Sequence, residues 1–309
     1  MTRRRLIIDC DPGTDDAIAL WLAFASPEVE VALVTVAGGN AGLESTLRNA
    51  RAVVALAGQS VPVVAGADRP LLGTFQAEVK VHGTDGLAGV RLPEGLPACP
   101  GQAADAIRDL LRAAAPASVT LVGIAAATNL ALALATEPAL ADRVDEIVLM
   151  TGALGEGNWT PGAEFNAAMD PEALAILLAT GRPTTLATLD LTAQALVTPA
   201  RAAALRARGG GHCLTACCDI MDAVPPSRRL GHLGHALHDP CAVAWIVAPD
   251  LFTTRAVAVQ VECGTGPGRG RTHIDRWGRS GAAASARLLE TIDANGFFAL
   301  LGDRMAALR

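Results

Sequence analysis

Short apolar segments alternate with longer amphipathic segments along most of the chain. The short segments predict strands at 5–9, 29–37, 61–64, 119–123, 145–150 and 185–189. The longer ones predict helices at 15–26, 43–57, 103–115, 129–136, 171–180 and 239–247. Strands that alternate with helices form βαβ units around a mainly parallel sheet. We therefore expect an α/β fold, with a single domain over residues 1–309 and a mostly parallel central sheet flanked by helices.

Residues 208–237 do not follow this alternation. They contain Gly209–Gly211 and Pro225–Pro226, and their hydrophobic periodicity is weak. Glycine and proline clusters of this kind are typical of irregular segments that cover functional sites. We predict an insertion of mixed loop and helix here, which acts as a flexible flap.

Charge and cysteine usage exclude some partners. The chain has 309 residues, 25 Lys plus Arg against 31 Asp plus Glu, and a net charge of −6. A surface for nucleic acid needs clustered positive charge, so we expect no nucleic-acid partner. The apolar run that follows the first arginines covers only residues 6–8, which is too short for a secretory signal. Seven cysteines, an odd number, then indicate reduced thiols and a cytoplasmic protein.

One uncharged stretch, residues 113–136, could be mistaken for a membrane span. Pro116, Gly123 and Asn129 interrupt it. A buried strand, a turn and a buried helix explain the same stretch without a membrane, so we expect no membrane partner.

The most informative motif is acidic and lies at the end of the first predicted strand. Asp9 and Asp11 share one side of that strand, because the side-chain period of a strand is two. Pro12–Gly13 forms a turn, and Asp15 and Asp16 open the next helix. Carboxylates this dense repel one another unless a cation holds them, and their oxygens suit Ca²⁺ or Mg²⁺. A water on such a cation, beside a carboxylate base, becomes a nucleophile.

The motif alone also fits a phosphatase of the haloacid dehalogenase type, which begins with a similar Asp-x-Asp. Such enzymes carry Thr or Val two residues after the second Asp. Here Gly13 stands at that position and Thr14 comes one residue late. A phosphatase therefore stays an alternative that the motif disfavours.

Four segments, in unchanged order between about residues 6 and 301, carry a family resemblance. They are Asp9–Ala17, Ala37–Asn40 with 43–50, Gly157–Asn166 with 170–173, and His238–Pro240. Together they resemble the inosine-uridine-type nucleoside hydrolases. The resemblance implies hydrolysis of ribonucleosides, one calcium ion and a homo-oligomer, a dimer or tetramer.

The resemblance also implies roles for particular residues. It assigns the calcium ligands to Asp11, Asp16, Asp239 and the backbone carbonyl of Thr128. It makes Asp11 the general base for the attacking water, and Asp9 a neighbour that orients these groups. It assigns the contacts to the ribose hydroxyls and the sugar pocket to Asp15, Asn40, Met150, Asn158, Glu164 and Asn166.

The reaction explains these residue types. Cleavage of a ribosyl C–N bond builds positive charge on the sugar, which carboxylate and amide oxygens stabilise. The leaving base departs more readily when it is protonated. His238, next to Asp239, is the natural acid because a histidine titrates near neutral pH. His82 stands where the family has a histidine or aromatic residue on the side of the nucleobase. Two interpretations of His82 are equally supported: contact with the nucleobase, or a polar residue of a loop.

Three departures from the family pattern concern packing and base preference. Ala193 stands where a histidine is common, and Thr151 where a glycine is usual. The chain contains no tyrosine, whereas pyrimidine-preferring members have tyrosines in the flap. His238 favours the group that handles inosine and uridine over the purine-specific group, which has tryptophan there. The preferred base stays open.

Other patterns are weaker. His232, His235 and His238 could suggest zinc, but the glycines among them disfavour a shared helix. Cys213, Cys217 and Cys218 match no common metal spacing. The alternative function that remains is a Ca²⁺-dependent ribose or nucleoside binder without catalysis, although binding alone needs neither Asp11 nor His238.

Overall fold

The computed structural model describes residues 3–308 and contains a large central sheet. The strands are β1 (Arg4–Cys10), β2 (Val29–Val36), β3 (Val63–Ala65), β4 (Val119–Gly123), β5 (Val144–Met150), β6 (Thr184–Ala187), β7 (Leu196–Val197), β8 (His235–Ala236), β9 (Phe252–Val261), β10 (Thr272–Asp275) and β11 (Ala286–Ile292). Within this part of the chain the main sheet has nine strands in the order β10-β9-β11-β6-β5-β4-β1-β2-β3. The strands from β3 to β11 in this order pair in parallel, whereas β9 pairs antiparallel with both β11 and β10.

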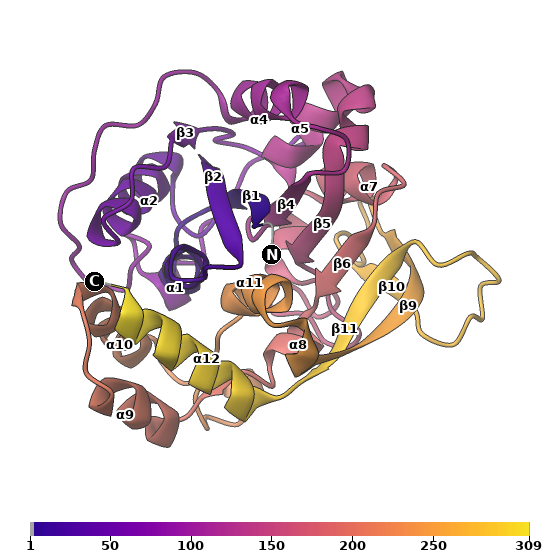
Figure 1. The fold of residues 1–309 in the computed structure, drawn as a ribbon. Helices are drawn as coiled ribbons and strands as arrows, with labels where there is room; N and C mark the ends of the chain where they lie inside the picture. Colours follow the sequence, from indigo (N-terminus) through magenta and orange to yellow (C-terminus); the bar gives the residue numbers. More distant parts are fainter. Residues whose placement is uncertain (1–2, 309) are drawn as a thin grey trace.

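Helices cover both faces of this sheet. They are α1 (Thr14–Phe24), α2 (Leu43–Leu56), α3 (Val79–His82), α4 (Ala103–Ala113), α5 (Thr128–Thr136), α6 (Phe165–Met169), α7 (Pro171–Leu178), α8 (Leu189–Thr192), α9 (Pro199–Ala207), α10 (His212–Ala223), α11 (Asp239–Val247) and α12 (Ala294–Ala307), with short 3₁₀ turns at Pro138–Arg143, Arg228–Leu230 and Pro249–Leu251. One core packs α1, α2, α10, α11 and α12 against the sheet, and the other packs α4, α5 and α7 against the opposite face. Figure 1 shows these two layers on either side of the strands.

The expected α/β fold with a mostly parallel sheet is confirmed. β4 and α11 have the predicted bounds, and the other predicted elements start and end within a few residues of the observed ones. Residues 208–237 contain loop and helix as expected, since α10 begins directly after Gly211. The mobility of this segment stays a prediction. Among residues 3–308, no helix has both the length and the apolar character that crossing a membrane requires.

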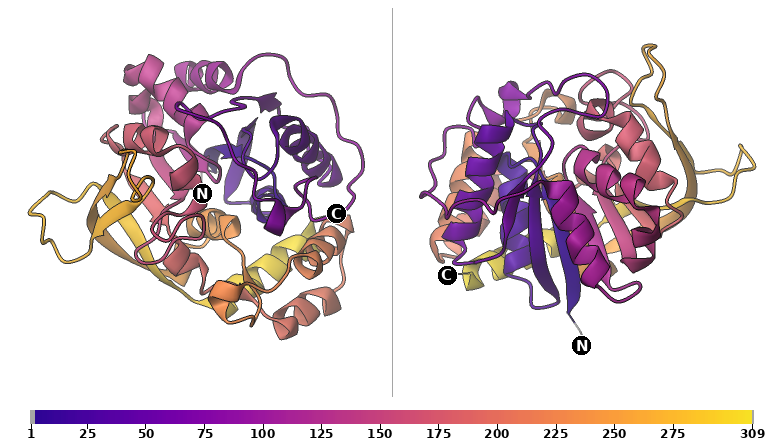
Figure 2. Two further views of the ribbon diagram at one scale, coloured as in Figure 1. Left: turned by 180° about the vertical axis from the view of Figure 1, so that it is seen from behind. Right: turned by 90° about the horizontal axis from the view of Figure 1, so that it is seen from above.

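The antiparallel end of the sheet was not predicted. β9 has buried and exposed positions without regular alternation, and it pairs with the two strands that follow it, β10 and β11. The loops at this end project from the body of the molecule in both views of Figure 2.

The fold places several polar residues at one edge of the sheet. β1, β2, β4 and β5 are parallel neighbours, so their carboxyl ends meet at the same edge. Ligands bind at this edge in open parallel sheets. Asp11 directly follows β1, and Met150 is the last residue of β5.

Candidate active site

A cavity of about 1040 Å³ opens at the carboxyl edge of the parallel strands. Residues from many parts of the chain line it. Those that the sequence predicted are Asp15, Asn40, His82, Met150, Asn158, Glu164, Asn166, His238 and Asp239. Asp11, Asp16 and Thr128 are buried and are not part of this lining. The fold therefore brings most of the predicted site residues to one cavity. The other three are buried in the surrounding protein.

Hydrogen bonds from two loops fix the carboxylates of Asp11 and Asp16: the turn between β1 and α1, and the loop after β2. The backbone N–H groups of Asp11 and Gly13 donate to the two carboxylate oxygens of Asp16, at 3.1 and 3.0 Å. The backbone N–H of Asn40 donates to Asp11 Oδ2 at 2.7 Å, and its side-chain amide donates to Asp16 Oδ2 at 3.0 Å. A Cβ atom on Gly39 would collide with Asp11 Oδ2, so this close approach requires glycine. The turn after β1 thus holds the Asp16 carboxylate, and the loop after β2 holds the Asp11 carboxylate at the same sheet edge.

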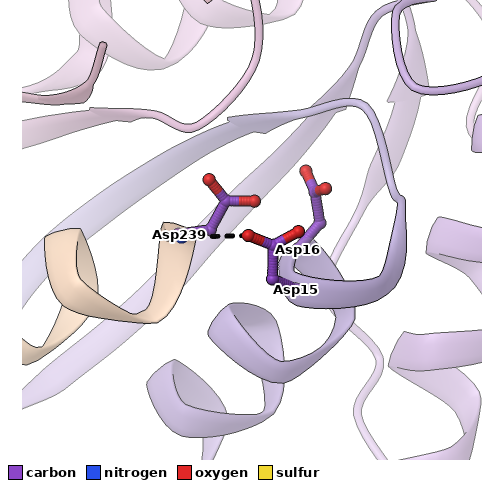
Figure 3. Close-up of side chains that lie close together, drawn as sticks. All are labelled: Asp15, Asp16 and Asp239. Atoms are coloured by element: carbon purple, nitrogen blue, oxygen red, sulfur yellow. Dashed lines mark hydrogen bonds between the residues drawn. The ribbon is translucent and has the colours of Figure 1, made fainter. Parts of the chain in front are cut away.

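Asp239 reaches the same place from the other end of the chain. It is the first residue of α11, which packs against α1. The backbone N–H groups of His238 and Asp239 donate to Asp15 Oδ2 at 3.2 and 3.4 Å. Asp15, Asp16 and Asp239 can each present one carboxylate oxygen so that all three lie within 4.8 Å of one another. Figure 3 shows this group, with α1 carrying two members and α11 the third.

The acidic group has the electrostatics of a cation site. Burial raises the pKa values of Asp11, Asp16 and Asp239, and mutual repulsion raises them further; that of Asp16 rises to about 7. Asp11 Oδ1 is buried without a hydrogen-bond partner among the described residues. Buried charge of one sign is costly unless a cation compensates it. The residues present therefore fit a hard divalent cation, although the geometry groups Asp15, rather than Asp11, with Asp16 and Asp239.

Asp9 is fully buried, and its side-chain hydrogen bonds go to β2 and α5 rather than to the acidic group. Its orienting role stays a prediction. Its Oδ1 accepts hydrogen bonds from Thr35 Oγ1 at 2.6 Å and Asn129 Nδ2 at 2.8 Å. Burial raises its pKa to about 7 despite these bonds. Asp9 thereby ties β1 to β2 and to the start of α5.

Thr128 begins α5, and the buried carboxylate of Asp170 holds its side chain. Its hydroxyl donates to Asp170 Oδ2 at 2.6 Å, and Asp170 is fully buried. The other oxygen of Asp170 caps α7 by accepting from the backbone N–H of Ala173 at 3.0 Å. Asp170 therefore connects the segment that contains Thr128 with the segment that contains Asn166.

Residues 157–166 and the end of β5 form the polar wall of the cavity. Glu164 accepts hydrogen bonds from the backbone N–H groups of Asn166 at 2.7 Å, Ala167 at 2.9 Å and Gly152 at 3.0 Å. Asn166 Nδ2 donates to the carbonyl of Met150 at 3.1 Å. Burial raises the pKa of Glu164. Thr151, one of the departures from the family pattern, lies beside Glu164, with its hydroxyl 3.3 Å from Oε2.

Asn158 supports the same wall. Its side-chain oxygen accepts from the backbone N–H of Phe165 at 2.9 Å. This bond spans the turn that precedes α6 and leaves the amide nitrogen of Asn158 available for other contacts.

His82 and His238 meet the cavity from different elements. The Nδ1 atom of His82 accepts from the backbone N–H of Thr14 at 3.1 Å, so the neutral ring carries its proton on Nε2. His238 Nδ1 lies 2.7 Å from Thr192 Oγ1. Burial lowers the pKa of both histidines, and the nearby Asp15 carboxylate opposes this effect.

The sequence assigns no role to some of the residues at the cavity. Thr14, Arg229 and His235 line the cavity, and Thr192 supports it through His238. In the sequence, His235 belongs only to a disfavoured zinc pattern. His232, His235 and His238 in fact lie in three different local structures: a left-handed turn, β8 and the N-cap of α11. Cys213, Cys217 and Cys218 are buried on α10 and pack in the core.

Comparisons with known proteins agree with this arrangement. Residues 6–299 match the family described as inosine-uridine preferring nucleoside hydrolase. Over 305 residues the chain is 40% identical to the pyrimidine-specific ribonucleoside hydrolase RihA of Shewanella woodyi, with 98% of each chain covered. A purine-preferring ribonucleoside hydrolase from Gardnerella vaginalis has a similar structure, with a TM-score of 0.90, 31% identity and 99% of each chain covered. A plant nucleoside hydrolase is also similar, with a TM-score of 0.90, 28% identity and coverage of 99% of this chain and 100% of that one.

Proposed function

The chain belongs to the inosine-uridine preferring nucleoside hydrolase family, and we propose that it hydrolyses the N-glycosidic bond of ribonucleosides in a Ca²⁺-dependent reaction. The observation that carries this proposal is the meeting of buried carboxylates from both ends of the chain beside one large cavity. The products are ribose and the free nucleobase.

Asp11, Asp16, Asp239 and the carbonyl of Thr128 are the proposed calcium ligands. The raised pKa values of the three carboxylates and the unpaired Oδ1 of Asp11 support this set. Asp15 is close enough to contribute charge, and its Oδ2 already accepts from two backbone N–H groups. When bound, the ion supplies positive charge for the ribose diol and lowers the pKa of a nearby water.

Asp11 is the proposed general base. Its Oδ2 is held by Asn40, whereas its Oδ1 has no partner in residues 3–308 and is free to accept a proton from the attacking water.

The polar wall is the proposed ribose site. Asp15, Asn40 and Asn166 are proposed to bind the lower hydroxyls, and Asn158 and Glu164 the 5′-hydroxyl. Met150 is proposed to pack against the sugar. These residues line one cavity and are anchored by backbone hydrogen bonds, so little reordering is needed on binding. Their oxygens also stabilise positive charge that develops on the ring.

The leaving base is proposed to lie beside His238 and His82. His238 is the proposed acid, since its Nδ1 is occupied by Thr192 and its other nitrogen remains available. His82 carries its proton on Nε2 and is therefore a hydrogen-bond donor to the base.

One assay panel tests the proposal. Inosine, uridine, adenosine, cytidine and a generic phosphate ester are incubated with the enzyme, with and without a chelator. Base release that stops with chelator and returns with Ca²⁺ supports the proposal. Nucleoside binding without base release would instead indicate a binding protein, and phosphate release would indicate a phosphatase.

The proposal covers ribonucleosides as a class, because similar proteins are named for pyrimidine and for purine preference. We further propose a cytoplasmic homo-oligomer. The family resemblance supports the oligomer, and the absence of disulfides among the seven cysteines is compatible with a reducing compartment. Sedimentation velocity checks the oligomeric state.

A further inference from the structure

His235 lines the cavity and has a buried polar atom that the fold does not satisfy. Its Nε2 is inaccessible to solvent and has no hydrogen-bond partner in the part of the chain that the structure describes. Native proteins leave few such atoms, and each calls for an explanation such as a ligand. The ring lies within electrostatic range of Asp15 and His238, which both line the same cavity.

The backbone fixes His235 firmly. His235 pairs with Val197 in the small antiparallel sheet of β7 and β8. On its N-terminal side, the carbonyl of Gly234 accepts from the backbone N–H of Ser227 at 2.7 Å. A Cβ atom on Gly234 would collide with the Val197 carbonyl oxygen, so the two strands approach closely only because residue 234 is glycine. The histidine side chain is thus directed by a rigid element rather than a free loop.

The surroundings of His235 are suited to a flat heteroaromatic ring. Ile220, Val224 and Leu237 line the cavity near it in the chain and are almost fully buried, and their side chains are apolar. Small-molecule sites of this kind combine apolar walls with a few polar groups that fix orientation. A nucleobase has apolar faces and a polar edge, which matches a cavity lined by both apolar side chains and an imidazole with an unpaired nitrogen.

We infer that the ring of His235 turns on binding so that its Nε2 hydrogen-bonds the polar edge of the leaving nucleobase, and that His235 is a specificity-determining residue of this enzyme. The inference rests on the proposed function, since it needs a nucleoside in the cavity. Burial lowers the pKa of His235, so the ring is neutral at pH 7 and its Nε2 either donates or accepts according to tautomer. It can therefore pair with a carbonyl oxygen, a ring nitrogen or an amino group of the base.

The decisive variant is His235→Phe, which keeps a flat ring and removes the polar atom. A buried polar atom without a partner is unfavourable, so this variant should be at least as stable as the parent. Its kcat/KM should fall by about 10- to 100-fold for the preferred nucleoside, and by unequal factors for uridine, cytidine, inosine and adenosine. His235→Gln, which offers both a donor and an acceptor, should recover part of the loss.

Two controls separate base contact from general damage. Ribose lacks a base, so its inhibition constant should stay within about twofold of the parent value if His235 acts only on the base. His273→Gln changes an exposed histidine on β10 and should alter neither readout. Equal losses on all nucleosides, weaker inhibition by ribose, or no loss at all would overturn the role of His235.

Binding measurements keep this test distinct from that of the proposed function. Nucleoside affinity is measured by calorimetry in an Asp11→Asn background, with and without His235→Phe. If the parent enzyme binds nucleosides but releases no base, the proposed hydrolysis fails, while a tenfold or larger loss of nucleoside affinity would still support His235. If the parent enzyme shows neither base release nor nucleoside binding, both proposals fail.

Discussion

Thr192 Oγ1 lies 2.7 Å from His238 Nδ1, which connects the short helix α8 to the residue that precedes α11. Thr192 is fully buried. A hydrogen bond at one imidazole nitrogen fixes both the orientation of the ring and the nitrogen that faces the substrate. Thr192 therefore positions His238 without contacting the substrate itself.

Thr192→Val keeps the size of this side chain and removes its hydroxyl. We expect kcat for natural nucleosides to fall by about tenfold, because the ring loses its fixed orientation. KM should change little, since the ribose wall is untouched. Thr192→Ser, which keeps the hydroxyl, should restore most of the rate, and a Ser variant as slow as the Val variant would contradict the hydrogen-bond role.

His238→Ala tests leaving-group protonation directly. We expect kcat to fall by about 100- to 10,000-fold for natural nucleosides, whose bases depart poorly without a proton. An activated aryl riboside, which departs without help, should lose far less. The comparison of kcat on the two substrates is the measurement, with His212→Ala on α10 as a control. An equal loss on both substrates would argue against His238 as the acid.

The sequence predicted the parallel part of the fold well for a physical reason. β1, β4 and β5 are buried on both faces over most of their length, so each contains a short apolar run that local pattern can detect. β9 and β11 carry exposed positions, and β11 joins the sheet by pairing with β6, which lies much earlier in the chain. The sequence pattern also does not predict α12. Gly296 lies in its first turn and lowers the local helix propensity, although the side chain of Asp293 caps the helix.

In the candidate site, too, local sequence motifs were predictable and tertiary contacts were not. Asp9 to Asp16 were recognised because they are adjacent in sequence and their repulsion points to a cation. Thr192 and His235 were not assigned roles because their partners lie in other elements and only the folded chain brings them together. Asp170 was seen only as part of a motif, whereas its hydrogen bond to Thr128 is a tertiary contact.

Asp239→Asn tests whether Asp239 is a calcium ligand. Removal of one of the clustered charges should weaken Ca²⁺ binding by at least about 100-fold, as measured by calorimetry. In the presence of chelator the variant should melt a few degrees higher than the parent, because one buried repulsive charge has been removed. Asp250→Asn, at an exposed position, is the control. Unchanged calcium affinity would remove Asp239 from the ligand set.

Asp11→Asn separates the base from the metal site. The amide cannot accept a proton from water, so we expect kcat to fall by about 100-fold or more. Inhibition by ribose should remain measurable, because the sugar wall is unaltered. Loss of ribose binding to the same extent as kcat would show that Asp11 acts mainly by holding the site together.

Calcium should stabilise the protein more at pH 8 than at pH 6. Without the ion, the pKa values of Asp9 and Asp16 are raised by burial to about 7, well above the ordinary value of 3.8. A raised folded-state pKa means that protonation favours the folded state. That contribution is present at low pH and is lost as the pH rises through about 7. The melting temperature of the apoprotein should therefore fall between pH 6 and pH 8.

Bound calcium compensates the ionised carboxylates, and its own binding releases protons, so this fall should disappear in the calcium-loaded protein. Thermal melts of metal-stripped and Ca²⁺-loaded enzyme at the two pH values measure the difference. A calcium-induced gain that is equal at both values, or larger at pH 6, would show that these carboxylates are ionised in the apoprotein throughout this range.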